Sequence, residues 1–288
     1  MSEQDLWLGN ALVFGGCGFL GHHIAKQLST ASDVAKVFVF DKKTSKNCIS
    51  GVEYITGDIT SKDDVDEAFK CVQPKVVFNT VFPNPFLNDN KVFHSVNVDG
   101  TKNIIAAARK NNCTMALVYT SSSSVIHDNP IAETLTLDAN GKDIRTAAIR
   151  PAGLFGEGDT ETVTSVISNA REGKARMQIG DNSNLFDWTY VGNNAYARKR
   201  ACGCEAFQIT NDEPWHFSTF TRALAAAGRY PVPAFKVVKV VKVPWSVMMG
   251  VLSFGSKKPR LTRARVKYVT MERTLDITKA KTRLGYRP

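Results

Sequence analysis

The sequence lacks the features typical of secreted and metal-binding proteins. Its first residues, MSEQDLWLGN, have no basic stretch followed by a long apolar run, so we expect no signal peptide and residence on the cytosolic side. The six cysteines are scattered, and only Cys202 and Cys204 stand close together, whereas a zinc site usually needs two such clusters. We therefore expect free thiols and no metal.

Acidic residues are scarce near the end of the chain. From Lys236 to Pro288 there are 14 lysines and arginines but only two acidic residues, Glu272 and Asp276. This segment carries +12, which leaves −2 for the rest of a chain whose net charge is +10. A basic tail on a nearly neutral body indicates an anionic partner, and phospholipid surfaces and nucleic acid both have that chemistry.

The 288 residues, 43% of them hydrophobic, suffice for one large domain or two small ones. Short apolar runs alternate with helical patterns through the first half of the chain. The strands expected from these runs are 11–14, 37–40, 52–55, 76–78, 116–119 and 146–149, and the helices run from 21 to about 29, over 63–69 and over 98–110. Strands that alternate with helices pair in parallel, so we expect an α/β fold, a Rossmann-type doubly wound sheet.

After Pro151 the alternation weakens. Helices are expected over 162–171 and 217–227, and a short strand over 206–210 is a candidate for a return to the main sheet. There is no internal repeat and no low-complexity linker. We therefore expect a dinucleotide-binding core over 1–150 and a smaller lobe, mainly substrate-binding, over 151–288.

The most specific local signal is the glycine-rich segment GGCGFLG. It places Gly15, Gly18 and Gly21 at three-residue spacing between an expected strand and an expected helix, with Phe19 and Leu20 at the start of that helix. Glycines there permit a tight turn and let the backbone approach a pyrophosphate, for which the helix N-terminus supplies N–H donors and a favourable dipole. The segment predicts a dinucleotide phosphate loop.

An acidic residue follows at the position that selects the dinucleotide. Asp41 ends the second expected strand, about 20 residues after the last glycine, where an acid binds the 2′-hydroxyl of the adenosine ribose. A carboxylate there repels a 2′-phosphate, so we expect NAD rather than NADP as cofactor. Lys42 and Lys43 should weaken this preference without reversing it.

Taken together, these segments resemble the extended short-chain dehydrogenases and, more narrowly, the 3β-hydroxysteroid dehydrogenase family in its fungal sterol branch. The resemblance covers nearly the whole chain. It rests on GGCGFLGHHI (15–24), GDIT (57–60), NPFLNDNKVFHSVNVDGTKNII (84–105), YTSSSSV (119–125), IRPAGLFGEGD (149–159), IGDNSNLFDWTYVGNNAYA (179–197), EAFQITNDEP (205–214), and the terminal PRLTRARVKY and DITKAKTRLGYRP.

The resemblance implies cofactor-binding roles for five matched residues. Asp58 and Ile59 would flank the adenine, and Asn79, Thr80 and Val81 would line the dinucleotide beyond the fourth strand.

It also implies an active site. Asn97 would support it from a helix, and Ser122 would hydrogen-bond the reacting oxygen, with Ser124 as a nearby alternative. Pro151 would lie near the nicotinamide.

One departure from the family bears directly on catalysis. Family members carry Tyr-x-x-x-Lys on the helix after the serine loop, in which the tyrosine moves the hydroxyl proton and the lysine lowers its pKa. No such pair occurs in this sequence, and Pro130 is followed directly by residues that look like the later part of that helix. Either the printed sequence omits residues between Asn129 and Ala132, and others near Arg198–Ala201 and Gly250–Leu252, or the protein lacks the pair and is inactive. We favour the first, because losing the middle of a helix also removes its core packing.

The resemblance implies NAD-dependent oxidation of the 3β-hydroxyl of a 4α-carboxysterol, with loss of CO₂. It further implies an oxidoreductase of sterol biosynthesis at the cytosolic face of the endoplasmic reticulum membrane, with a sterol substrate, no nucleic acid partner, and as further candidates a homodimer and contacts with other enzymes of sterol C4 demethylation. Two alternatives stay open: a nucleotide-sugar epimerase or dehydratase of the same fold, and a catalytically inactive dinucleotide-binding regulator.

The segment 244–254, PWSVMMGVLSF, is uncharged and has bases on both sides. It is too short to span a bilayer, which needs about 20 residues. It is either a helix of the core or substrate pocket, or a shallow membrane attachment with Trp245 at the headgroup level.

If the attachment is correct, the protein should bind anionic vesicles and leave them as salt rises, because the Debye length shortens. Charge reversal at five basic residues should release it, and these are Lys257, Lys258, Arg260, Arg263 and Arg265. Co-sedimentation with phosphatidylserine vesicles measures this. No binding at low salt would leave the pocket helix as the interpretation.

Overall fold

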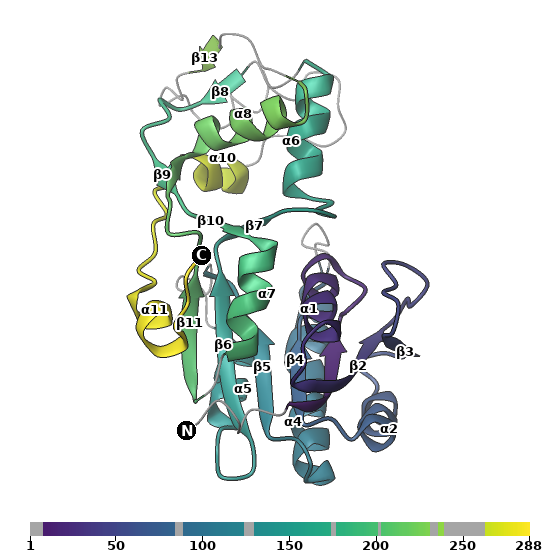
Figure 1. Ribbon diagram of the computed structural model, residues 1–288. Coiled ribbons are helices and arrows are strands. Elements are labelled where there is room, and N and C mark those ends of the chain that lie inside the picture. Colours follow the sequence, from purple (N-terminus) through teal and green to yellow (C-terminus); the bar gives the residue numbers. More distant parts are fainter. Residues whose placement is uncertain are drawn as a thin grey trace. The chain divides into compact units, whose positions relative to one another are not determined.

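The computed structural model describes residues 8–83, 89–123, 130–173, 177–200, 203–230, 236–238 and 263–288. The chain forms two compact units (Figure 1). Unit 1 comprises Met1–Leu154, Thr189–Thr210 and Asp276–Pro288, and unit 2 comprises Phe155–Trp188 and Asn211–Leu275. The apolar segment 244–254 and Ser124 lie outside the described residues.

Unit 1 contains a sheet of seven parallel strands in the order β11-β6-β5-β4-β1-β2-β3. The strands are β1 (Gly9–Phe14), β2 (Val34–Asp41), β3 (Glu53–Thr56), β4 (Val76–Asn79), β5 (Ala116–Thr120), β6 (Arg145–Pro151) and β11 (Glu205–Ile209). The direction of winding reverses between β1 and β4, as in a Rossmann-type doubly wound sheet. The predicted fold class is confirmed, and residues 205–209 form an edge strand of this sheet.

Each strand of the sheet sends alternate side chains to opposite faces. In β1, Ala11 and Val13 belong to one hydrophobic cluster, whereas Leu12 and Phe14 belong to the other. Residues of α1 (Phe19–Ser29), α7 (Val191–Arg200) and α11 (Thr278–Leu284) complete the first cluster. Residues of α2 (Lys62–Val72) and α4 (Gly100–Asn111) complete the second. Helices therefore cover both faces of the sheet, as its continuous apolar strands require.

The helix expected over 98–110 differs from prediction at its start. The helical segment begins earlier, with α3 (Asn90–His94), continues through a π-helical turn, η2 (Ser95–Asp99), and only then becomes α4. Single π-helical turns within helices often occur at functional sites. Helix α5 (Ile131–Asp138), at the point in the chain where the family resemblance implies a catalytic helix, has only eight residues.

Unit 2 contains α6 (Thr162–Arg171), α8 (Phe217–Ala227) and α10 (Arg263–Thr270). Its strands are short: β8 (Met177–Ile179) pairs with β13 (Lys236–Val238), and β9 (Leu185–Phe186) pairs with β12 (Trp215–His216). Two more short strands, β7 (Gly153–Phe155) and β10 (Trp188–Tyr190), include the residues where the chain passes between the units. The core of unit 2 is aromatic, with Trp188 stacked on Phe220 at a centroid distance of 4.0 Å. Among the described residues, no helix is long and apolar enough to cross a bilayer.

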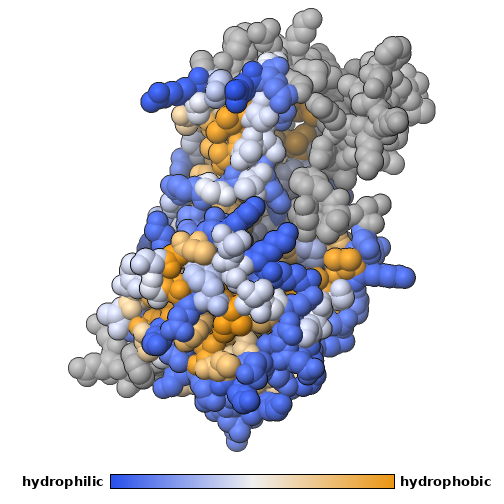
Figure 2. Space-filling view, turned by 90° about the vertical axis from the view of Figure 1, so that its right-hand side faces the viewer, coloured by the Kyte–Doolittle hydropathy of each residue, from blue (hydrophilic) through white to orange (hydrophobic). Residues whose placement is uncertain are grey.

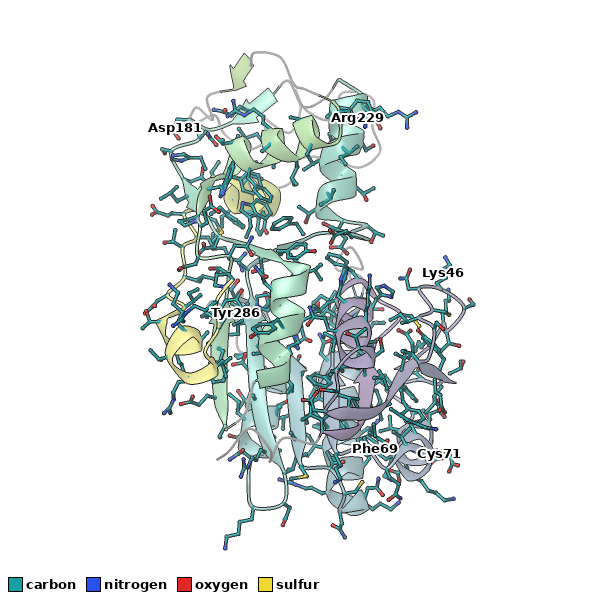
Figure 3. The ribbon with its side chains drawn as sticks, viewed as in Figure 1. Lys46, Phe69, Cys71, Asp181, Arg229 and Tyr286 are labelled. Atoms are coloured by element: carbon teal, nitrogen blue, oxygen red, sulfur yellow. The ribbon has the colours of Figure 1, made fainter. Side chains whose placement is uncertain are left out.

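The end of the chain is fixed to unit 1 by a buried tyrosine, Tyr286, which is labelled in Figure 3. Its side chain is fully buried, and its hydroxyl donates to the carbonyl oxygen of Thr210 at 2.8 Å. This contact anchors the C-terminal segment after α11 next to the edge strand β11.

Helix α7 buries a charged side chain in the core of unit 1. Arg198 is fully buried, and its Nε donates to Oδ1 of Asn194 at 2.8 Å. Neither of its terminal nitrogens has a hydrogen-bond partner among the described residues. Burial lowers the pKa of Arg198 to about 9. An unpaired guanidinium in the core costs free energy, because its hydration is lost and not replaced.

We therefore expect Arg198→Met to raise the free energy of unfolding by about 1–3 kcal/mol at pH 7. The gain should shrink as pH rises above 9, because the folded wild type releases its proton there while the unfolded chain keeps it. Urea unfolding at pH 7 and pH 10 measures both effects. Arg145→Met, at an exposed position of β6, is the control and should change stability by less than about 0.5 kcal/mol. A destabilised Arg198→Met protein would contradict the account.

Candidate functional site

At Gly15 and Gly21 the glycine loop leaves no room for a side chain. Gly15 has φ +76°, and a Cβ there would lie 2.9 Å from Oγ1 of Thr80. A Cβ on Gly21 would lie 2.2 Å from the carbonyl oxygen of Gly15, so the first turn of α1 packs directly on the loop. Gly18 is the N-cap residue of α1 and brings no side chain to cap this helix. Phe19, Leu20 and Gly21 thus form a helix N-terminus that suits an anionic ligand.

Two further residues of this loop carry structural roles that the spacing argument missed. A Cβ on Gly16 would lie 2.5 Å from Cγ2 of Val39, so this glycine lets the loop pass over β2. The backbone N–H of Cys17 donates to Oδ2 of Asp41 at 3.1 Å. The glycine doublet 15–16 could have indicated the close packing of Gly16 on β2. Nothing in the sequence indicated the hydrogen bond from Cys17 to Asp41.

Asp41 is fixed at the carboxyl end of β2. Besides the bond from Cys17, its Oδ1 accepts from the N–H of Lys43 at 3.3 Å, and its carbonyl accepts from Gly57 at 3.1 Å. A direct hydrogen bond therefore joins Asp41, the residue predicted to bind the ribose, to the predicted phosphate loop.

Asp58 and Ile59 follow β3 at the same edge. The N–H of Asp58 donates to Oδ2 of Asp64 at 2.8 Å, and Lys42 forms an ion pair with its carboxylate. Burial opposes ionisation of Asp58, but the bonds from Lys42 and Thr60 outweigh it, so its pKa lies below the ordinary value. Ile59 is buried, and the side chain of Asn103 donates to its carbonyl oxygen at 3.0 Å.

The end of β4 is held by a network of hydrogen bonds. Oδ1 of Asn79, which is buried, accepts from the N–H of Val81 at 3.2 Å, and Nδ2 donates to Oγ1 of Thr101 at 3.3 Å. Oγ1 of Thr80 donates to the carbonyl oxygen of Phe14 at 2.7 Å. Since β4 lies beside β1, these residues border the glycine loop.

The expected active-site residues lie at the ends of the next strands. Ser122 is half-buried two residues beyond β5, and Pro151 ends β6, where it is paired in register with Ile209. Among the described residues, neither Oδ1 of Asn97, in the π-helical turn, nor the buried Oγ of Ser121 has a hydrogen-bond partner. The edge thus retains buried oxygens that a further donor would satisfy.

The described residues of this edge supply no tyrosine–lysine pair. Helix α5 begins at Ile131, and the carbonyl oxygen of Pro130 accepts from the N–H of Thr134 at 2.9 Å. Residues 130–132 thus form the start of one helix. Asn129, residues 201 and 202 and residues 250–252 lie outside the described residues, so the expectation that residues are missing between Asn129 and Ala132, near Arg198–Ala201 and near Gly250–Leu252 stays a prediction.

A buried ion pair and a buried phenol are present instead. Arg150 on β6 binds the buried carboxylate of Glu133 on α5 through Nε and Nη2, with the Nε bond at 2.9 Å. Burial, and then the nearby charge of Glu133, raise the pKa of Tyr119 on β5 to about 12. A general base works best with a pKa near the operating pH, so Tyr119 is unsuited to the role. No group of three or more His, Cys, Asp or Glu side chains in the described ranges could hold a metal ion.

The seven-stranded parallel sheet, the glycine loop and the acid at the end of β2 define a Rossmann-type α/β protein of the short-chain dehydrogenase kind. The pattern of the 3-beta hydroxysteroid dehydrogenase/isomerase family matches residues 12–136 and 129–234. The chain belongs to this family.

Named relatives match over the whole chain. It is 34% identical to the sterol-4-alpha-carboxylate 3-dehydrogenase, decarboxylating, of Saccharomyces cerevisiae, covering 100% of this chain and 95% of the relative. A mouse protein of the same name is 32% identical over 96% of this chain and 86% of its own. A 3beta-hydroxysteroid-dehydrogenase/decarboxylase of Arabidopsis thaliana is 32% identical over 100% of this chain and 60% of its own.

Solved structures agree in fold. A UDP-glucose 4-epimerase of Thermotoga maritima has a TM-score of 0.75 at 18% identity, covering 97% of this chain and 93% of its own. A dTDP-glucose 4,6-dehydratase of Bacillus anthracis has a TM-score of 0.71 at 16% identity, covering 97% of this chain and 91% of its own. At such identities the likeness supports the fold alone.

The comparisons also bear on the missing pair. The alignment with the yeast relative spans 339 positions against the 288 residues of this chain, which leaves 51 positions with no residue here. The two segments that match the family pattern meet at residues 129–136, where the expected tyrosine and lysine are absent.

The close contact at Gly21 gives a direct test of the phosphate loop. Gly21→Ala should weaken NAD⁺ binding at least about 10-fold, because its Cβ would displace the Gly15 carbonyl and the loop. Gly141→Ala, where a Cβ meets nothing within 4 Å, is the matched control and should bind like the wild type. Isothermal titration calorimetry measures both. Equal affinities for the two variants would exclude this loop as the binding element.

Proposed function

We propose that this protein is an NAD-dependent oxidoreductase that converts the 3β-hydroxyl of a sterol 4α-carboxylate to a ketone, with loss of CO₂. The observation that carries the proposal is the full-length similarity, at 31–34% identity, to fungal, plant and mammalian enzymes named for this chemistry. The geometry of the glycine loop and Asp41 supports the NAD-dependent part of the proposal.

The residues of unit 1 fit an NAD⁺ molecule. The N-terminus of α1 would bind the pyrophosphate, and Asp41 would accept hydrogen bonds from the adenosine ribose. Asp58 and Ile59 would contact the adenine. Asn79, Thr80 and Val81 would line the dinucleotide beyond β4. Pro151 would lie near the nicotinamide, and Asn97 would support the active site from its helix. In this proposal residues 1–150 are the NAD-binding core and most of 151–288 is the substrate-binding lobe.

The chemistry needs one oxidation and no separate decarboxylation machinery. Bound NAD⁺ would accept the hydride from C3 of the sterol, while the hydroxyl proton passes to a base. The product is a β-keto acid, whose C4–carboxyl bond breaks as its electrons delocalise into an enolate that is then protonated. Ser122, with Ser124 as the alternative, would hydrogen-bond the reacting oxygen, and the base would be the family tyrosine.

A second candidate function is dinucleotide binding without turnover. The absence of Tyr-x-x-x-Lys from all 288 residues favours it. A serine hydroxyl such as that of Ser122 is too weak a base to take up the hydroxyl proton by itself, and Tyr119 holds its own proton too tightly to serve. The epimerase alternative draws support only from the shared fold.

We further propose that the protein attaches to the cytosolic face of the endoplasmic reticulum membrane. A sterol partitions into lipid, and the basic segment after Lys236 would meet anionic headgroups there. Association into a homodimer, or with enzymes that act on the same sterol, belongs to the same proposal. The vesicle experiment above tests the membrane contact.

Intact mass and turnover of the protein from its native source separate the two candidates. The first predicts a mass above 31.6 kDa, and NADH and CO₂ from a 3β-hydroxysterol 4α-carboxylate. The matching sterol without the carboxylate should give NADH without CO₂. The second candidate, dinucleotide binding without the tyrosine–lysine pair, predicts a mass of 31.6 kDa and NAD⁺ binding. Its turnover should be lower than that of an enzyme with the pair by the roughly 10²- to 10⁴-fold that acid–base catalysis contributes. Full turnover at 31.6 kDa would show that the chain uses another base.

A further inference from the structure

An ion pair joins the ends of β2 and β3 at the proposed cofactor edge. Nζ of Lys42 lies 2.8 Å from Oδ2 of Asp58, and the two side chains are 59% and 34% exposed. The carboxylate of Asp58 is held in place, because its Oδ1 accepts from the N–H of Thr60 at 2.9 Å. The backbone N–H of Asp58 donates to Oδ2 of Asp64, and Oδ1 of Asp64 accepts from the hydroxyl of Ser61 at 2.8 Å. The partner of Lys42 is therefore a fixed group.

The ion pair lies next to the residue that selects the cofactor. Lys42 follows Asp41 directly, and Asp41 pairs in register with Thr56, two residues before Asp58. The N–H of Gly57 donates to the carbonyl oxygen of Asp41 at 3.1 Å, which ties the two strand ends together. Hence the Lys42 ammonium lies at the same strand ends as the carboxylate that would bind the ribose.

This placement matters because a lysine just after the ribose-binding acid is suited to attract a 2′-phosphate. A lysine paired with Asp58 offers less charge to that phosphate, since Asp41, Lys42 and Asp58 together carry −1. With Asp58 neutral the same three groups would carry zero, and the ammonium would be free to turn toward the ribose.

We infer that Asp58 is a specificity-determining residue, which strengthens the preference for NAD over NADP by holding the Lys42 ammonium away from a 2′-phosphate. The inference rests on the NAD binding proposed above. It revises the sequence-based expectation that Lys42 weakens the preference, because the expected effect of that charge is largely cancelled by Asp58.

The same two strands offer a matched control. Lys36 and Glu53 form an ion pair of 3.1 Å between β2 and β3, near the opposite ends of these strands, with side chains 65% and 57% exposed. Figure 2 shows the face that carries β3 and α2, where hydrophilic residues predominate. Glu53→Gln removes the same charge as Asp58→Asn, but at the start of β3 and not just beyond its carboxyl end.

The experiment measures equilibrium binding of NAD⁺, NADP⁺ and 2′,5′-ADP by calorimetry at low ionic strength. Asp58→Asn should lower the ratio of the NADP⁺ and NAD⁺ dissociation constants about 3- to 10-fold, and any weaker binding of the adenine should affect both nucleotides alike. Adding Lys42→Ala to it should restore the wild-type ratio, and Glu53→Gln should leave the ratio unchanged. Raising the salt concentration should reduce the extra affinity of Asp58→Asn for NADP⁺, because added ions screen the Lys42 charge.

Asp58→Ser keeps the inference testable even if Asp58→Asn does not fold, because it removes the same carboxylate charge and should lower the ratio by a similar factor. An unchanged ratio in the Asp58 variant that folds, or an equal shift in Glu53→Gln, would each overturn the inference. Failure of the wild type to bind any of the three nucleotides would instead contradict the NAD proposal, and the inference with it.

Discussion

The contact between the first turn of α1 and the carbonyl oxygen of Gly15 constrains the whole cofactor edge. A hypothetical Cβ on Gly21 would lie only 2.2 Å from that oxygen, so this position of the first helical turn accepts no side chain. The loop so formed presents the N–H of Cys17 to Asp41, and Gly15 lies against Thr80. One close approach of backbone to backbone thereby aligns elements from β1, β2 and β4 at a single edge.

The sequence predicted the part of the fold that depends on short-range patterns. Buried parallel strands read as apolar runs, so the six strands of the first half were expected within a few residues of where they lie, and helices α6 and α8 were expected with their observed bounds. The π-helical turn at Asn97 was not predicted, because helical periodicity does not distinguish the two hydrogen-bonding patterns. The short strands of unit 2 were missed since two or three residues carry no measurable alternation.

The candidate site also has a part that local sequence patterns predicted and a part that only the folded chain shows. Glycine spacing and an acid at a strand end are local, and both predicted groups lie together at the carboxyl edge. The bond from Cys17 to Asp41 and the Lys42–Asp58 ion pair join residues 16 or more positions apart, so only the folded chain reveals them. Asn97 and Ser122 were assigned through the family resemblance, because no local pattern singles them out. The buried side-chain oxygens of Asn97 and Ser121 have no hydrogen-bond partner among the described residues.

A crystal structure of the protein with NAD⁺ tests the central claim most directly, because the claim concerns where the edge of one sheet binds one dinucleotide. The account predicts the pyrophosphate at the N-terminus of α1, the adenosine ribose hydroxyls on the carboxylate of Asp41, and Lys42 still paired with Asp58. A dinucleotide bound elsewhere, or one whose ribose faces away from Asp41, would contradict it.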